Sequence, residues 1–279
     1  MDTTGLTDRI SALTADNSAT VQDRISAVMT LREELKPDDE TEQKELDAVC
    51  YKALSDMVAA ENGDHACDIE MFQLYTLLIE TYRRLNRFRP MKDIITGTVR
   101  LIDDCDVSFQ VIEQAVPRIL YAAKASVYNH DRSRLLAAYI RAAGRAMADD
   151  EYVDNDTVVS YIRTFLNLYG LLDPSTRPDL LDADMQIIIG WFIPHDEFCN
   201  IIDHPKDDGL LLKDPVEYTL RWEEVYYDVV EELDRRFAGE PRYMGFCFRY
   251  WPEMANLLWE KYGIRWHDPH LMNPGVMFD

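Results

Sequence analysis

Apolar residues recur every three or four positions through most of this 279-residue chain, and only 11 glycines interrupt the pattern. Such spacing gathers apolar side chains on one face of an α-helix, whereas a half-buried strand alternates them at every second residue. One such face near the start of the chain contains Val21, Ile25, Val28, Leu31 and Leu35. The sequence therefore predicts an all-α protein.

Capping residues, prolines and glycines mark the ends of further helices. The expected ranges are 39–60, 68–87, 90–103, 131–148, 155–170 and 214–237. Another helix is expected to begin at Asp106 and to be kinked or divided by Pro117. A short one is expected between Pro252 and Gly263. The segment 68–87 is apolar on almost every side, so its helix should be central.

The predicted helices follow one another as antiparallel hairpins, which indicates a stacked, irregular helical repeat over residues 1–190. From about residue 174 onward, prolines become frequent and aromatic residues become denser. Residues 191–279 are therefore expected to form a smaller, aromatic-rich, mainly helical module with an extended tail, packed on the hairpin array. Within this module the apolar run 243–251 fits either a short strand or a helical turn.

The corner between two predicted helices reads Tyr82-Arg83-Arg84-Leu85-Asn86-Arg87-Phe88. It resembles the turn of a tetratricopeptide repeat, where an aromatic and a small residue lie between the two helices of a hairpin. The resemblance covers one hairpin. Asn86 stands where that family favours glycine, and the predicted hairpins are not spaced at the family's repeat of about 34 residues. The resemblance implies stacked antiparallel helices and carries no function to this chain.

The chain is strongly acidic, with 29 Lys and Arg residues, 51 Asp and Glu residues and a formal net charge of −22. Repulsion at long range argues against binding to nucleic acid or to an anionic membrane surface. The charge is uneven, at −11 over residues 1–70, +5 over 71–148 and −16 over 149–279. The basic middle is either paired inside the chain or exposed as a surface for an acidic partner.

Six arginines of this basic middle form a candidate binding surface: Arg83, Arg84, Arg87, Arg134, Arg141 and Arg145. The first three crowd one predicted hairpin corner, and the other three lie on the predicted helix 131–148. Guanidinium groups bind carboxylates and phosphates bidentately, so stacked hairpins that align the two sets would form an anion-binding face. The favoured hypothesis is a non-enzymatic interaction or scaffold protein that binds an acidic peptide or protein there.

Histidines beside carboxylates give a second hypothesis, a metal-dependent hydrolase. The candidate ligands are His195, His204, His267 and His270. Imidazole and carboxylate groups bind zinc or iron, which can activate a water molecule. No H-E-x-x-H spacing is present, and capping and packing are the simpler roles for these histidines. Motifs for nucleotide binding and for α/β-hydrolases are absent too, so no cofactor is expected.

The aromatic residues near the C-terminus give a third hypothesis, an enzyme or ligand carrier with a pocket between the two modules. The candidate lining residues are Tyr243, Trp251, Trp259 and Trp266. Aromatic side chains at this density more often form a core than a pocket.

Compartment and association are inferred from the termini and the cysteines. The first residues lack the pattern of a secretory signal, and the longest apolar run, 187–193, is far shorter than the ~20 residues of a membrane span. Five widely spaced cysteines suit reduced thiols and a cytoplasmic protein: Cys50, Cys67, Cys105, Cys199 and Cys247. The apolar tail, residues 264–279, is expected to fold over its own helices or to dock on a partner or a second copy.

Overall fold

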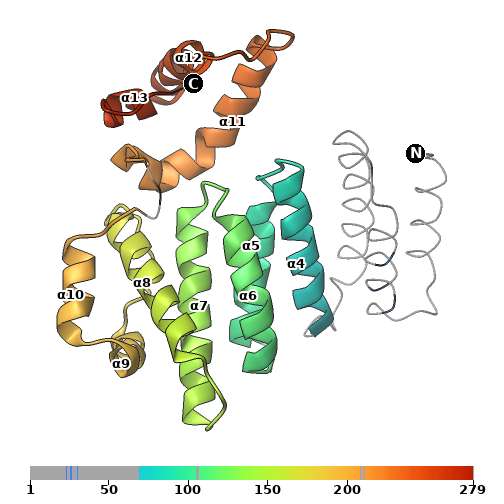
Figure 1. Ribbon diagram of the computed structural model, residues 1–279, viewed down its shortest axis with the longest axis vertical. Coiled ribbons are helices and arrows are strands. Elements are labelled where there is room, and N and C mark those ends of the chain that lie inside the picture. Colours follow the sequence, from blue (N-terminus) through green and yellow to red (C-terminus); the bar gives the residue numbers. More distant parts are fainter. Residues whose placement is uncertain are drawn as a thin grey trace. The chain divides into compact units, whose positions relative to one another are not determined.

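The computed structural model describes residues 23, 26, 30, 69–104, 107–207, 209 and 211–278. All regular secondary structure in these residues is helical, which confirms the predicted all-α fold of helical hairpins with an aromatic-rich C-terminal region (Figure 1). The helix predicted over 39–60 and most of the one over 21–35 lie outside the described residues, as do Cys50, Cys67 and Cys105.

Contacts divide the chain into two compact units. The first comprises Met1–Ser126 and Ala137–Val153, and the second comprises Val127–Leu136 and Asp154–Asp279. Helix α7 (Asn129–Ala148) therefore contributes its start to the second unit and the rest to the first. The domain boundary expected near residue 190 stays a prediction.

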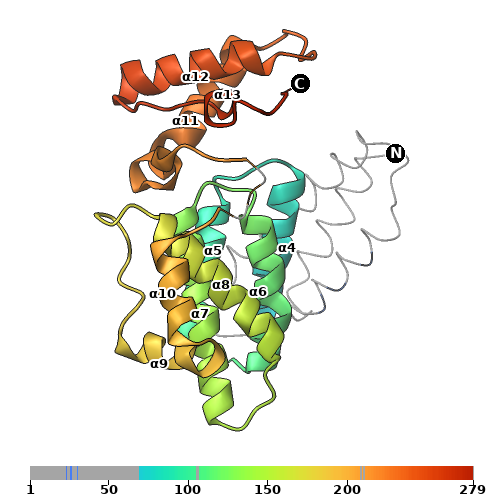
Figure 2. The same ribbon diagram turned by 60° about the vertical axis from the view of Figure 1, so that its left-hand side comes forward.

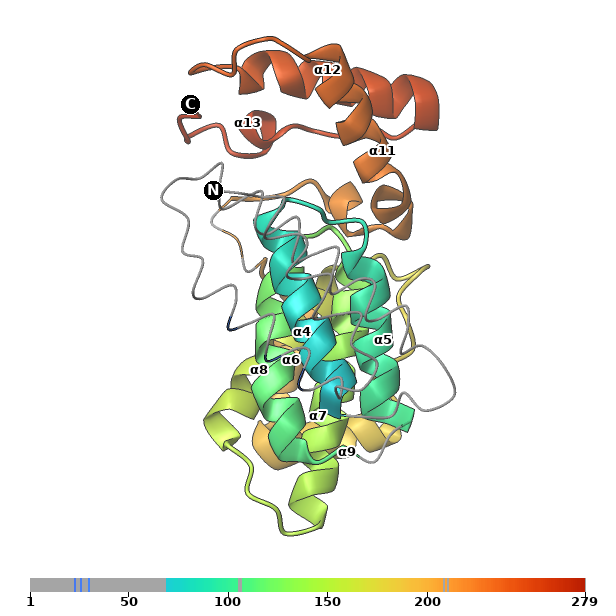
Figure 3. The same ribbon diagram turned by 90° about the vertical axis from the view of Figure 1, so that its right-hand side faces the viewer.

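The first unit contains α4 (Ile69–Arg84), α5 (Met91–Asp104), α6 (Phe109–Ala123) and the later part of α7. Helix α4 packs against both α5 and α6, which also pack against each other (Figure 3). The apolar faces form a core in which Phe72, Ile95 and Val116 are fully buried. Helix α6 continues undivided through Pro117.

One residue in α5 and one in the turn after α4 have particular local roles in this unit. A Cβ atom at Gly97 would lie 2.6 Å from the hydroxyl of Tyr75, so a larger residue there would force the Tyr75 ring to move away from α5. Asn86 has φ 53°, a left-handed conformation that asparagine tolerates better than most residues. The turn after α4 is closed there by a hydrogen bond of 2.8 Å from the Arg87 N–H to the Tyr82 carbonyl.

The second unit contains the start of α7 and seven further helices (Figure 2). They are α8 (Asn155–Leu171), α9 (Ala183–Phe192), α10 (His195–Asp203), the 3₁₀ helix η1 (Pro215–Tyr218), α11 (Leu220–Arg236), α12 (Cys247–Tyr262) and α13 (Pro269–Met272). Helix α8 packs against α9 and α10, and α11 packs against η1 and α12.

Two helices of this unit differ from the predicted ranges. The single helix expected over 214–237 is divided at Thr219, whose extended backbone ends η1 and whose hydroxyl accepts the Trp222 N–H at 3.2 Å to cap α11. The run 243–251 is not a strand, because α12 begins within it at Cys247 and includes Pro252. Gly263 ends α12 as predicted, with φ 64°.

The C-terminal tail packs on its own unit. The Trp266 ring lies 5.8 Å from the ring of the buried Trp222, and its Nε1–H donates to Glu217 Oε1 at 2.8 Å. Burial raises the pKa of Glu217. Asn273 both accepts from the Leu212 N–H, at 2.8 Å, and donates to the Leu212 carbonyl, at 2.9 Å. These contacts make the tail part of the folded unit.

None of the helices in the described part of the chain combines the length and the apolar surface that crossing a bilayer requires.

Candidate functional site

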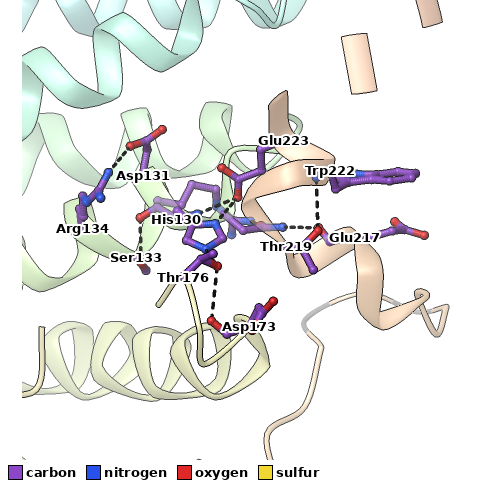
Figure 4. A network of polar contacts seen from close by, with 12 residues as sticks. His130, Asp131, Ser133, Arg134, Asp173, Thr176, Glu217, Thr219, Trp222 and Glu223 are labelled. Carbon is purple, nitrogen blue, oxygen red and sulfur yellow. Dashed lines mark hydrogen bonds and ion pairs between the residues drawn. The ribbon is translucent and has the colours of Figure 1, made fainter. Parts of the chain in front are cut away.

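A buried polar cluster fixes the start of α7 (Figure 4). His130 and Glu223 are only 1% and 3% exposed. Glu223 Oε1 accepts the backbone N–H of His130 at 2.9 Å and lies 2.8 Å from the Nδ1 atom of the same residue. Glu223 thus supplies a hydrogen-bond acceptor at the start of α7, where the first N–H groups of a helix lack partners within the helix.

Other segments of the second unit hold the same helix start. His130 Nε2 lies 3.1 Å from Thr176 Oγ1, in the connection between α8 and α9. Asn129 Nδ2 donates to the Glu217 carbonyl at 3.4 Å. The Asn129 Oδ1 atom accepts from Arg132 Nη1 at 3.1 Å. The cluster therefore fixes the positions of the Asn129 and Arg132 side chains.

Asn129 and Arg132 line a cavity of about 300 Å³ in the second unit. The other lining residues come from α8, from the segment after α10 and from η1: Ser160, Arg163, Thr164, Asn167, Leu168, Leu171, Lys206, Asp207, Lys213 and Tyr218. The α8 residues among them recur at intervals of three and four, so one face of that helix forms a wall.

The lining is strongly cationic. Its lining residues include four basic ones, Arg132, Arg163, Lys206 and Lys213, and one acidic one, Asp207. Lys213 Nζ lies 3.4 Å from Asp207 Oδ2, an atom that is buried and has no hydrogen-bond partner among the described residues. Arg163 Nε donates to Glu197 Oε1 at 2.7 Å, and this hydrogen bond raises the pKa of the guanidinium. The ion pairs of Lys213 with Asp207 and of Arg163 with Glu197 compensate only part of the positive charge of the four basic residues.

The neutral polar side chains of the cavity are largely committed to the backbone. Asn167 accepts the Lys206 N–H at 2.7 Å and donates to the Arg163 carbonyl at 2.9 Å. The Thr164 hydroxyl donates to the Ser160 carbonyl at 2.9 Å. What the cavity offers a ligand is therefore mainly the N–H donors of ammonium and guanidinium groups, which suit an oxyanion.

The structure gives the six predicted arginines partners inside the chain. Arg83 lies over the Tyr121 ring, 4.3 Å from its centre, and Arg134 Nη1 lies 2.9 Å from Asp131 Oδ1. Arg84 and Arg87 also interact within the chain. Arg141 lies 3.4 Å from Asp103, and Arg145 donates to the Ile102 carbonyl at 3.0 Å. Arg134 belongs to the second unit and the other five to the first.

The four predicted metal ligands do not converge. His195 Nε2 lies 3.5 Å from Cys199 Sγ, His267 Nδ1 lies 2.6 Å from Asp214 Oδ2, and the His270 ring packs edge-on against Phe248. His204 is exposed at the end of α10. Across 69–104, 107–207, 209 and 211–278, no three His, Cys, Asp or Glu side chains form a group that could hold a metal ion.

The four aromatic residues predicted to line a pocket lie in different environments. Trp266 packs on Trp222, and the Trp251 ring packs edge-on against Phe278 at 5.1 Å. Tyr243 and Trp259 are 57% and 51% exposed. Two of the four are thus packed within the second unit and two are on its surface.

Sequence reasoning missed the cavity because its basic residues are far apart along the chain. Arg132 and Lys213 are separated by 81 positions, and Lys213 lies in the acidic segment 149–279. The one local signal was the polar stripe of Ser160, Thr164 and Asn167 on a predicted helix.

No family model, curated protein or solved structure matches this chain.

Proposed function

We propose that this protein is a non-enzymatic binding protein whose second unit takes the anionic group of an acidic ligand into the cationic cavity. The observation that carries the proposal is the gathering of four basic side chains against one carboxylate, in a chain with a net charge of −22. The proposed ligand is acidic, as the sequence predicts. The contact is placed at the cavity rather than at the six arginines, because the cavity gathers its basic residues around one volume of the second unit, whereas the six arginines are divided between the two units.

Local charge governs binding inside a cavity. Salt screens charges that are more than about 8 to 10 Å away at physiological ionic strength, so the lining groups dominate the field that a bound ion meets. Hydrogen bonds from ammonium or guanidinium groups to an oxyanion are about twice as strong as those between neutral groups. An anion therefore gains attraction in the cavity even though the whole chain is acidic.

The first test is the double substitution Lys206→Met and Lys213→Met in the full-length protein. Isothermal titration calorimetry with sulfate and succinate should show binding of at least one of these probes to the unsubstituted protein. The double variant should lose affinity about tenfold or more, because two ammonium donors are removed. An unchanged affinity would contradict the proposal.

The matched control is Lys261→Met, which removes a lysine of the same unit that is paired with Glu232 outside the cavity. It should leave anion affinity unchanged. An equal loss in this control would show a response to net charge rather than to the cavity. Circular dichroism of each variant checks that the helices are retained.

The substitution Asp207→Asn is expected to strengthen anion binding about three- to tenfold, because the carboxylate of Asp207 competes with the ligand for Lys213. Asparagine keeps the Oδ1 atom that accepts the Gly209 N–H at 3.2 Å. Asp203→Asn, outside the cavity, is the control and should change affinity little. Titration calorimetry compares the three proteins, and weaker binding by Asp207→Asn would refute a competing role.

A further inference from the structure

The cations of the cavity come from three different segments of the second unit. Arg132 lies in the first turn of α7, Arg163 lies in the middle of α8, and Lys206 and Lys213 lie in the segment between α10 and η1. From this arrangement we propose that the anionic group is a phosphate monoester, which deepens the proposed function and rests on it.

The shape of the anion decides between the two commonest biological oxyanions. A carboxylate has two oxygens in one plane, and a single guanidinium fork satisfies it. A phosphate monoester presents three terminal oxygens that diverge from the phosphorus, so it takes donors from several directions at once. Three donor segments around one cavity match the phosphate.

The charge of the anion also favours a phosphate monoester. Four basic side chains and one carboxylate line the cavity, and the pairing of Arg163 with Glu197 lowers their net charge from +3 to +2. A monoanion would leave one of these positive charges without compensation, whereas a phosphate monoester carries about −1.5 to −2 at neutral pH. The dianion therefore neutralises more of the cavity than a carboxylate or a sulfate monoester does.

The size of the cavity limits what the phosphate is attached to. Its volume of about 300 Å³ is at the lower end of the range of ligand sites. Leu168 and Leu171 supply apolar surface, and Asn167 and Thr164 already bond to the backbone. The cavity thus fits the phosphate with a small attached group, carried either by a small molecule or by a phosphorylated side chain.

The experiment compares methyl phosphate, methyl sulfate and acetate by titration calorimetry against the full-length protein at pH 7.5 and pH 5. Methyl phosphate and methyl sulfate have the same shape. The phosphate loses most of its second charge below its second pKa of about 6, whereas the sulfate stays a monoanion. The charged and titratable residues that line the cavity are Arg132, Arg163, Lys206, Asp207, Lys213 and Tyr218, with no histidine among them.

At pH 7.5 methyl phosphate is expected to bind at least tenfold more tightly than methyl sulfate or acetate. Its affinity should fall severalfold at pH 5, while the affinity of methyl sulfate stays nearly constant. The Lys206→Met and Lys213→Met double variant should lose the preference for phosphate. A phosphoserine peptide that binds more tightly than methyl phosphate would identify a protein-borne phosphate, and equal affinities would identify a small molecule, both in support of the phosphate assignment.

Two results would overturn the inference, and they are distinguishable. Acetate or methyl sulfate binding as tightly as methyl phosphate at pH 7.5 would refute the phosphate assignment and leave the anion-binding function standing. No binding of any of the three probes, nor of sulfate or succinate, would refute both.

Discussion

A His130→Ala substitution is expected to lower the free energy of unfolding of the second unit by about 1 to 3 kcal/mol, the range seen when a buried hydrogen-bonding group loses its partner. The substitution leaves the carboxylate of Glu223 buried with only the backbone N–H of residue 130 as a partner. The second oxygen of Glu223 is already buried and has no hydrogen-bond partner in the described part of the chain. Urea denaturation followed by tryptophan fluorescence measures the loss.

Fluorescence suits this measurement because all five tryptophans of the chain lie in the second unit. The matched control is His195→Ala, at an exposed position, which should change stability by no more than about 0.5 kcal/mol. The double variant His130→Ala with Glu223→Ala should lose less than the two single losses added together, because it removes the stranded carboxylate. Equal losses for His130→Ala and His195→Ala would contradict the role given to the buried pair.

A Trp222→Ala substitution is expected to cost about 3 to 5 kcal/mol, as large-to-small changes in a packed core do. Trp222 is 2% exposed and packs in the core of the second unit with Leu233 and Leu258. Its ring also contacts the rings of Tyr226 and Trp266, so the change removes aromatic packing from both the helix and the tail.

The control for this change is Trp259→Ala on the same unit, since Trp259 is 51% exposed. Urea denaturation followed by circular dichroism compares the two variants without depending on which tryptophan remains. Trp259→Ala should cost less than about 1 kcal/mol. Similar losses in both variants would contradict the assignment of Trp222 to the core.

The sequence predicted helices best where local chemistry marks their ends. The start of α5 after Pro90 and the end of α12 at Gly263 depend on the backbone preferences of one residue each. The break at Thr219 was missed because apolar residues keep their helical spacing across it. The run 243–251 could not be assigned because a short apolar run satisfies both a strand and a helix pattern.

The cavity could not be predicted from the sequence, because charge clustering along a chain reports neighbours rather than packing. Arg134 is paired with Asp131, three residues earlier on the same helix, so the residues that suggested a binding surface also supply its partner. The basic residues of the cavity approach one another only through the packing of the second unit, and Arg132 is held there by Asn129. Their convergence depends on tertiary structure that spacing along the chain does not encode.

In an acidic chain with a cationic cavity, the charges that act on an anion before it binds differ from those that act on it once it is bound. Before contact, an anion meets the repulsion of a chain with a net charge of −22, and after entry it meets the attraction of the cavity. Salt weakens both effects, so it speeds association by screening the repulsion and speeds dissociation by screening the attraction. For the anionic ligand proposed above, the residence time is thus expected to depend on the few residues of the cavity, and the association rate on the charge of the whole chain.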